Sequence, residues 1–380
     1  MTVRTTTLVL ISLATTGMGV SQLFAEHDDG GIRNGDRDMG KGFVYIATNQ
    51  PAGNTVIEYI RALDGSLTQA SQAPTGGLGG TGNGVGNLDP LGSQDSLVLN
   101  ENGSVLLAVN AGSNELSSLT AGNSGVHLLS KVSSGGSFPN SVALKGRLVY
   151  VLNAHGTPNV SGFRLDSSGV LTSLAGSTHN LPGGAAAAPH DVRFSPDGTR
   201  LIVTEGGTDH IDVFQLDEDG LISSQTTQAS AGSGPFGFEF GRDGILLNSE
   251  AATASVSSYR LTHQDTLTTI SAAVPDHQAA TCWITLTGSG RFAFVSNTGS
   301  GTLASYAIGE EGAVQLLNST AASLPGGAPI DSARSANSKF LYVVDSALGR
   351  IFSFRIQGSS LDPVATISGL PATLQGIAAQ

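Results

Sequence analysis

A repeating unit of short β-strands constrains the fold of this chain more than any other feature. Its clearest copy is residues 188–220, APHDVRFSPDGTRLIVTEGGTDHIDVFQLDEDG, in which β-favouring runs are separated by Pro196-Asp197-Gly198 and by Gly206-Gly207. Pro and Gly at such places favour tight turns, because Pro presets its backbone angle and Gly accepts positive φ. The pattern predicts four short antiparallel strands in about forty-five residues, which is the period of a propeller blade.

Two sets of landmark residues repeat with the same period along the chain. One set precedes the first turn of each copy, at Asp95, Asn140, His190, Phe236, Cys282, Ile330 and Leu374. The other set follows the second strand, at Asn49, Asn110, Asn153, Glu205, Glu250, Asn297 and Asp345. In six copies an aromatic residue lies nine or ten positions after the second landmark: Tyr59, Phe163, Phe214, Tyr259, Tyr306 and Phe354. Seven copies predict an all-β fold, a seven-bladed β-propeller of four-stranded antiparallel blades.

The two ends of the chain are expected to complete one blade together. The first copy begins at Phe43 and lacks its own first strand, whereas residues 372–380, ATLQGIAAQ, resemble a first strand without a blade. We therefore predict that the C-terminal strand joins blade 1 and closes the ring, which removes free sheet edges. The propeller would then occupy residues 43–380 as one domain.

The residues before the propeller read as an export signal and a linker. Residues 1–25 contain Arg4, a mostly apolar stretch from Leu8 to Phe24, and Ala25 as a plausible cleavage residue. The apolar core is too short and too interrupted to make a good membrane anchor. Residues 26–42 are polar and lack a hydrophobic period, which is typical of a flexible linker. We therefore expect a periplasmic or secreted protein with no membrane attachment after signal cleavage.

Composition excludes several classes of partner and chemistry. The chain carries 18 Lys and Arg against 30 Asp and Glu, a formal charge of −12, and no basic patch. Nucleic acid is therefore not an expected partner. The single cysteine, Cys282, permits no internal disulfide and no paired-cysteine metal site. We expect a monomer without a cofactor or a bound metal.

The blade motifs resemble a known family. The stretches APHDVRFSPDGTRLIVTEGGTDHIDVF, GRFAFVSNTGSGTLASY and KFLYVVDSALGRIFSF are similar to those of the seven-bladed propeller lactonases, which include propeller-type 6-phosphogluconolactonases and carboxymuconate-lactonising enzymes. The likeness covers essentially all of residues 43–380. It implies hydrolysis of a lactone ring at the mouth of the central channel.

Antiparallel pairing places both sets of landmark residues at one mouth of that channel, because the start of the first strand lies beside the end of the second. A lactonase needs a base and donors for the developing oxyanion. We therefore predict His190, Glu205 and Glu250 as catalytic residues. Substrate-binding positions are predicted from neighbouring sites on the same two ladders: Asp191, Asn153, Asn297, Trp283, Asp331 and Asp345. The resemblance supports His190, since the family also shows a Pro-His motif there.

Blade 5 departs from the family pattern. The resemblance implies Pro-Arg-His in that blade, whereas this chain has Pro235-Phe236-Gly237. The cation that would grip a phosphate or carboxylate is missing, so a neutral lactone is the better substrate hypothesis than a phosphorylated sugar acid.

Several alternative interpretations stay open at this point. The Asn residues of the second ladder also suit turn formation, and Glu205, Glu250 and Asp345 also suit solvated rim charges. Oxygen donors in one ring would suit calcium. Trp283 would equally suit packing. The alternative function is a non-catalytic exported propeller that binds a small ligand or a protein on the same face. The glycine-rich insertion at residues 75–92 has no role that the sequence assigns.

Overall fold

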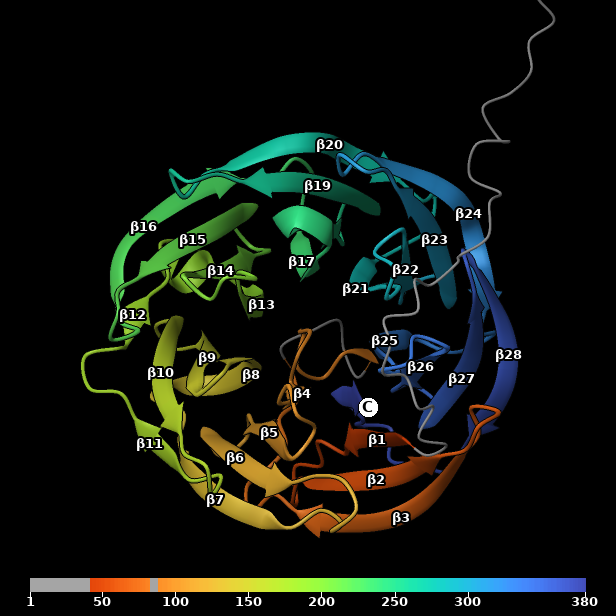
Figure 1. Ribbon diagram of the computed structural model, residues 1–380, viewed down its shortest axis with the longest axis horizontal. Helices are drawn as coiled ribbons and strands as arrows, with labels where there is room; N and C mark the ends of the chain where they lie inside the picture. Colours follow the sequence, from red (N-terminus) through yellow and green to blue (C-terminus); the bar gives the residue numbers. More distant parts are fainter. Residues whose placement is uncertain (1–41, 83–87) are drawn as a thin grey trace, which may run out of the picture.

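The computed structural model describes residues 42–82 and 88–380, and within them the strands form a ring of seven antiparallel sheets around a central channel (Figure 1). The predicted seven-bladed propeller is thereby confirmed. The predicted signal peptide and all but the last residue of the predicted linker lie outside the described residues. Strand β1 begins at Gly42.

Each blade runs outward from the channel in strand order. Blade 1 is β29 (Ile377–Ala379), β1 (Gly42–Ala47), β2 (Thr55–Arg61) and β3 (Leu67–Pro74); blade 2 is β4 (Leu97–Leu99), β5 (Val105–Asn110), β6 (Glu115–Thr120) and β7 (Leu128–Ser133); blade 3 is β8 (Ser137–Lys145), β9 (Leu148–His155), β10 (Asn159–Leu165) and β11 (Leu171–Ser173), with β12 (His179–Asn180) also on β10; blade 4 is β13 (Pro189–Phe194), β14 (Arg200–Glu205), β15 (His210–Leu216) and β16 (Ile222–Ala229).

The remaining blades follow the same order. Blade 5 is β17 (Pro235–Phe240), β18 (Ile245–Glu250), β19 (Ser255–Leu261) and β20 (Leu267–Pro275); blade 6 is β21 (Thr281–Leu286), β22 (Phe292–Asn297), β23 (Thr302–Ile308) and β24 (Val314–Ser323); blade 7 is β25 (Pro329–Arg334), β26 (Phe340–Asp345), β27 (Arg350–Gln357) and β28 (Ser360–Ile367). In the described part of the chain, short 3-10 helices lie in the loops at Gly184–Ala186 and Arg242–Gly244.

The burial pattern explains why the inner strands are apolar and the outer strands are not. Blades stack face to face, so a strand such as β14, RLIVTE, is buried on both faces and reads as a continuous apolar run. The outer strand β16, ISSQTTQA, is mostly exposed and carries polar residues. The six aromatic residues of the repeat, Tyr59, Phe163, Phe214, Tyr259, Tyr306 and Phe354, are all buried, in the hydrophobic clusters that lie between blades.

The C-terminal strand closes the ring as predicted. Val44 pairs with Ala379 and Ile46 with Ile377 in antiparallel register. Backbone hydrogen bonds from Gln375 N to Ala47 O and from Gln380 N to Phe43 O extend this pairing at both ends. The strand therefore supplies the innermost strand that blade 1 would otherwise lack.

Candidate functional site

In blades 3 to 7 both ladders of landmark residues end at the same opening of the channel, which we call the His190 mouth. The inner two strands of each blade pair so that the start of one lies opposite the end of the other. The pairs that define this end are Pro139 with Asn153, Pro189 with Glu205, Pro235 with Glu250, Thr281 with Asn297, and Pro329 with Asp345. The expectation that the ladders share a mouth is confirmed for these five blades, whereas the side chain of Asp95 in blade 2 lines a pocket at the opposite end of the channel.

A pocket of about 510 Å³ lies at the His190 mouth. Its walls come from several blades and from the glycine-rich insertion. They include His190 of blade 4, Phe236 of blade 5, Cys282 and Thr298 of blade 6, and Leu88 and Asp89 of the insertion. Small residues such as Gly234, Ala251 and Ala280 complete it, so the pocket is largely apolar.

His190 is held in one orientation and one protonation state. Its Nδ1 lies 2.6 Å from the carbonyl oxygen of Gly92. A carbonyl only accepts, so Nδ1 carries the proton and Nε2 keeps its lone pair. The ring stacks on Phe236 with centroids 4.2 Å apart. Burial lowers the pKa of His190 to about 4, against the opposing effect of the Gly92 hydrogen bond, so the imidazole is neutral at neutral pH.

The imidazole of His190 fits in its position because residue 206 is a glycine. A Cβ atom added at Gly206 would overlap Nε2 of His190. Gly206 follows Glu205 directly at the end of β14. The Gly206-Gly207 pair that the sequence marked as a turn therefore also leaves room for the imidazole.

Two further ionisable groups line the same pocket. Asp89 is buried, and its Oδ1 accepts a hydrogen bond of 2.8 Å from Gly92 N. Burial raises the pKa of Asp89 to about 7, while hydrogen bonds from Gly92 and Gln375 partly oppose this shift. Burial also raises the pKa of the Cys282 thiol well above its usual value, so the sulfur stays protonated. The pocket thus holds a neutral imidazole, a neutral thiol and a carboxyl that titrates near neutral pH.

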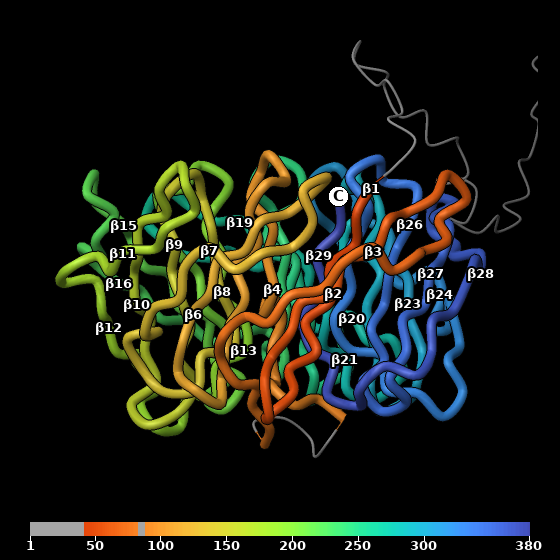
Figure 2. The backbone as a smooth tube through the Cα atoms, turned by 90° about the horizontal axis from the view of Figure 1, so that it is seen from below, coloured from red at the N-terminus to blue at the C-terminus, as the bar shows by residue number. Residues whose placement is uncertain are grey.

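Residues 88–94, at the end of the insertion and just after it, contact several blades across the channel at this mouth. Gln94 N donates to His190 O at 3.1 Å, and Trp283 Nε1 donates to Ser93 O at 2.8 Å. The hydroxyl of Ser346 donates to Leu88 O. These contacts join the segment to blades 4, 6 and 7, and Figure 2 shows its described part on the lower side of the ring. Sequence reasoning missed Asp89 because its place depends on this crossing, although the length of the insertion was a signal.

The carboxylates of the second ladder are buried and bind the chain that leads into each blade. Glu205 accepts hydrogen bonds from Gly183 N at 3.0 Å and from Thr208 Oγ1 at 2.6 Å. Glu250 accepts from Gly232 N at 2.8 Å and from Ser255 Oγ at 2.7 Å.

Asp345 makes the same kind of contact, accepting from Ala328 N at 3.0 Å. Glu205, Glu250 and Asp345 are fully buried, so the interpretation as solvated rim charges is wrong for all three. Their hydrogen bonds favour a structural role, and the catalytic assignment of Glu205 and Glu250 stays a prediction.

The predicted asparagines and the tryptophan are also buried. Asn153 Nδ2 donates to Ser134 O and Asn159 Oδ1, and Asn297 Oδ1 accepts from Thr281 Oγ1 at 2.8 Å. Trp283 packs edge-on against Phe236, with ring centroids 4.8 Å apart. Trp283 thus packs against the aromatic wall of the pocket without lining the pocket itself. Of the predicted site residues, only His190 lines the pocket.

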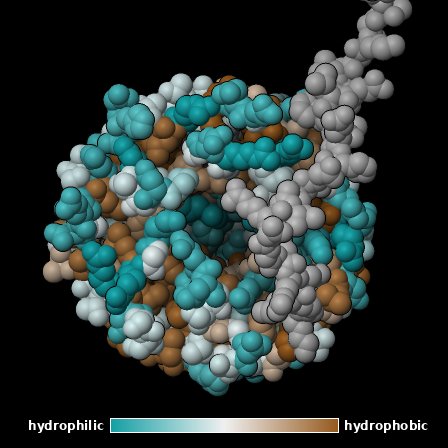
Figure 3. All heavy atoms as spheres, viewed as in Figure 1, coloured by the Kyte–Doolittle hydropathy of each residue, from teal (hydrophilic) through white to brown (hydrophobic). Residues whose placement is uncertain are grey.

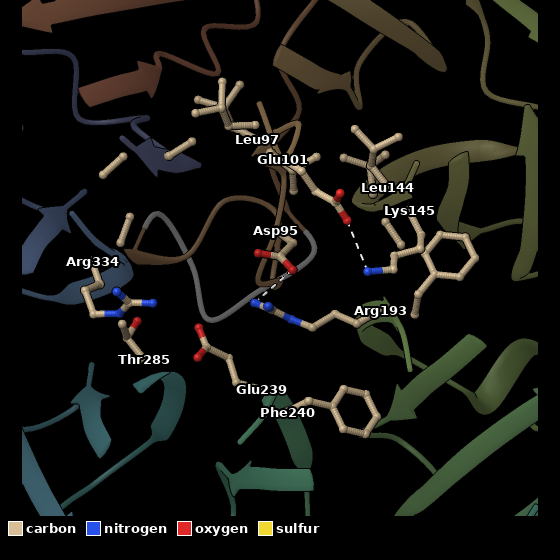
Figure 4. Close-up of a pocket in the computed structure, with 18 of the residues that line it drawn as sticks. Asp95, Leu97, Glu101, Leu144, Lys145, Arg193, Glu239, Phe240, Thr285 and Arg334 are labelled. Carbon is tan, nitrogen blue, oxygen red and sulfur yellow. Dashed lines mark hydrogen bonds and ion pairs between the residues drawn. The ribbon is translucent and has the colours of Figure 1, made fainter. Parts of the chain in front are cut away.

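A second pocket lies at the opposite end of the channel and is lined by Arg193 and Asp95, whereas Asp191 and Asp331 are buried and line neither pocket. Asp191 Oδ2 accepts from Arg193 Nε at 3.3 Å and from Phe238 N at 3.1 Å. Arg193 also forms an ion pair of 2.8 Å with Asp95. We call this opening the Arg193 mouth; Figure 4 shows Arg193 and Asp95 within it. The predicted substrate-binding residues therefore do not line a common pocket.

Neither a metal centre nor a membrane helix emerges from the described ranges. No group of three or more His, Cys, Asp and Glu side chains in residues 42–82 and 88–380 is arranged to hold a metal ion. No helix within those ranges has the length and apolar character needed to cross a membrane.

Comparison with known proteins gives a consistent picture. The sequence profile of the family described as lactonase, 7-bladed beta-propeller matches residues 84–372. The periplasmic gluconolactonase of Pseudomonas aeruginosa superposes with a TM-score of 0.69 at 19% identity, covering 88% of this chain and 98% of its own. A Bacteroides fragilis protein provisionally assigned as a 6-phosphogluconolactonase superposes with a TM-score of 0.70 at 20% identity, covering 90% and 99%. No curated protein sequence matches this chain.

Proposed function

Because the chain belongs to the seven-bladed beta-propeller lactonase family, we propose that it hydrolyses a neutral lactone at the His190 mouth. The observation that carries this proposal is the free lone pair of His190 Nε2 in a pocket of about 510 Å³. The Pseudomonas aeruginosa relative is a periplasmic gluconolactonase, which supports the same reaction type and export of this chain to the periplasm or the medium.

The reaction needs one base and one acid function, which His190 can supply in turn. Nε2 accepts a proton from a water molecule whose oxygen attacks the lactone carbonyl carbon. The ring C–O bond then breaks, and the leaving oxygen takes the proton back from Nε2, which gives an open-chain hydroxy acid. Asp89, partly protonated near its pKa of about 7, is the candidate hydrogen-bond donor to the carbonyl oxygen.

The walls of the pocket favour an uncharged substrate. Phe236 stands where the resemblance implies an arginine, and its ring stacks on His190 instead of presenting a cation. No Lys or Arg lines this pocket among the described residues. A phosphate or carboxylate would lose its hydration here without gaining a charged partner.

A second candidate function is binding without turnover. A histidine whose pKa is about 4 is a weak base, so it activates water only weakly. The same pocket would then hold a small neutral ligand or a side chain of a protein partner.

A lactone panel separates the two functions. Purified protein is incubated with neutral and acidic lactones, and ring opening is followed by acid release, while binding is measured by calorimetry. We expect turnover of a neutral lactone that His190→Ala abolishes, with His127→Ala, an exposed histidine in blade 2, as the matched control. Absence of turnover above the His190→Ala background for every lactone would overturn the enzyme proposal, and binding without turnover would support the second function.

A further inference from the structure

The pocket at the His190 mouth has more room than the reacting groups of a lactone need. Its volume is about 510 Å³. Sites that enclose whole drug-sized ligands have volumes of about 300–1,000 Å³. In the proposed reaction only His190 and Asp89 act on the ring, so most of the pocket is left for the substituents that the substrate carries.

The side chains of the remaining walls are mainly apolar. Leu88 and Phe236 are the large apolar residues, and Ala252 and Ala280 are among the small ones. The Cys282 thiol, which burial keeps neutral, acts as a further small apolar group. Leu88 is 38% exposed, so a ligand that covers it removes apolar surface from water. These walls therefore favour a hydrocarbon substituent.

Hydroxyl groups on the substrate would find few partners in the same pocket. Apart from His190 and Asp89, Thr298 is the remaining lining residue with a side-chain nitrogen or oxygen in the part of the chain that the structure describes. Its hydroxyl group already donates to Pro329 O at 2.9 Å. A polyhydroxylated ring would thus lose the water around its hydroxyls without gaining equivalent hydrogen bonds, which costs free energy.

Main-chain groups of the walls are engaged in hydrogen bonds of their own. Ala251 N donates to Gly234 O at 2.8 Å, and Gly234 N donates to Asp209 Oδ1 at 2.6 Å. Thr298 N donates to Ala280 O at 3.0 Å. These bonds extend the pairing of the two inner strands in blades 5 and 6 as far as the pocket. A ligand hydroxyl would have to break such a bond to use these groups.

We propose that the His190 mouth selects lactones that carry an alkyl chain over polyhydroxylated sugar lactones. This inference rests on the proposed lactone hydrolysis. The lactone ring would lie at His190 and Asp89, and the alkyl chain would pack against Phe236 and Leu88. The Pseudomonas aeruginosa relative is a gluconolactonase, so the two proteins would share a fold and a reaction type but differ in the class of lactone.

Three δ-lactams test this preference by calorimetry, because an amide ring resists hydrolysis and only binding is measured. The full chain is titrated with δ-valerolactam, its 6-pentyl derivative and glucono-δ-lactam. We expect the pentyl group to tighten binding about thirtyfold or more, since burial of each methylene is worth up to about fourfold in affinity. Glucono-δ-lactam should bind no more tightly than the unsubstituted ring. The proposal is overturned if glucono-δ-lactam binds more tightly than the pentyl lactam, or if the pentyl group gains less than about threefold.

A variant of the wall locates the alkyl chain. Ala252 lines the pocket and is exposed, so Ala252→Leu fills part of the space without changing the buried core. We expect this variant to reduce the affinity gained from the pentyl group about tenfold. Ala62→Leu, at an exposed alanine that lines neither pocket, is the matched control and should change each affinity less than about twofold. An unchanged gain in Ala252→Leu would contradict the proposed place of the chain.

The corresponding lactones separate this inference from the proposed function. δ-Valerolactone, δ-decalactone and glucono-δ-lactone carry the same substituents as the three lactams, and their ring opening is followed by acid release above the His190→Ala background. Preferred binding of the pentyl lactam without turnover of any lactone would overturn hydrolysis and retain the ligand class. Turnover of glucono-δ-lactone in preference to δ-decalactone would retain hydrolysis and overturn the ligand class.

Discussion

The two mouths of the channel are built by the same seven inner strands, yet they differ in chemistry. The His190 mouth has an aromatic and aliphatic pocket in which the imidazole and the thiol are kept neutral by burial. At the Arg193 mouth, an arginine forms ion pairs with Asp95 and Asp191. At the first mouth residues 88–94 contact blades 4, 6 and 7 across the channel, whereas the hollow at the second is visible from outside (Figure 3). The two openings differ because the two ends of one ring of strands carry different residues.

Both mouths depend on closure of the ring. A chain that lacks residues 373–380 loses β29 and the buried side chains of Leu374, Ile377 and Ala378. We expect it to lose on the order of 5 kcal/mol or more of unfolding free energy, together with ligand binding at the His190 mouth. Scanning calorimetry measures this, with a chain lacking only Gln380 as the control. A truncated protein that melts like the full chain would contradict ring closure by β29.

The buried carboxylate of Glu250 separates structural from catalytic roles. Glu250→Ala removes the acceptor of Gly232 N and Ser255 Oγ, and we expect a loss of about 2–4 kcal/mol in unfolding free energy. Urea denaturation gives this value, and turnover of the folded variant should stay near that of the wild type. Unchanged stability combined with lost turnover would instead support the catalytic prediction for Glu250.

Gly206 should affect one mouth only. Gly206→Ala places a methyl group against Nε2 of His190, so the imidazole must move, at a cost of about 1–3 kcal/mol. We expect lactone turnover or binding at the His190 mouth to be lost. Gly244→Ala, where a Cβ meets nothing within 4 Å but φ is positive, is a control for general backbone strain. Turnover in Gly206→Ala equal to that of the wild type would contradict the role of Nε2.

The pH dependence of stability should reveal two opposing groups at the His190 mouth. The pKa of His190 is lowered to about 4, so between about pH 4 and 6.5 the unfolded chain binds more protons and this group makes stability rise with pH. The pKa of Asp89 is raised to about 7, so below that pH the folded chain binds more protons and this group makes stability fall as pH rises.

Removing one of the two groups should leave the pH dependence of stability that the other group causes. The difference in unfolding free energy between variant and wild type should change as pH rises from 4.5 to 6.5. This difference should rise for Asp89→Asn and fall for His190→Gln, with slopes of up to about 1.4 kcal/mol per pH unit. Urea denaturation at the two pH values measures both slopes. Slopes of the same sign for the two variants would contradict the assignment.

The smallest effect is expected at the rim of the Arg193 mouth. Lys145 and Glu101 form an ion pair of 3.1 Å, with 41% and 71% of the side chains exposed. Lys145→Ala should change the unfolding free energy by about 0–1 kcal/mol, because exposed ion pairs are screened by water and salt. A double-mutant cycle with Glu101→Ala measures the coupling. A coupling free energy above about 2 kcal/mol would show that this ion pair stabilises the fold more than its exposure suggests.

The sequence by itself determined the blade number, closure by residues 372–380 and, in blades 3 to 7, the sharing of one mouth by both ladders. These follow from local periodicity, since a turn every few residues and antiparallel pairing fix where each strand begins and ends. The tertiary structure decided which ladder residues line a pocket. Glu205 looks free in the sequence but is buried against Gly183, and Asp89 reaches His190 only because its insertion crosses the channel. Arg193 meets Asp95 from another blade for the same reason: contacts across the ring depend on its curvature, which no local pattern encodes.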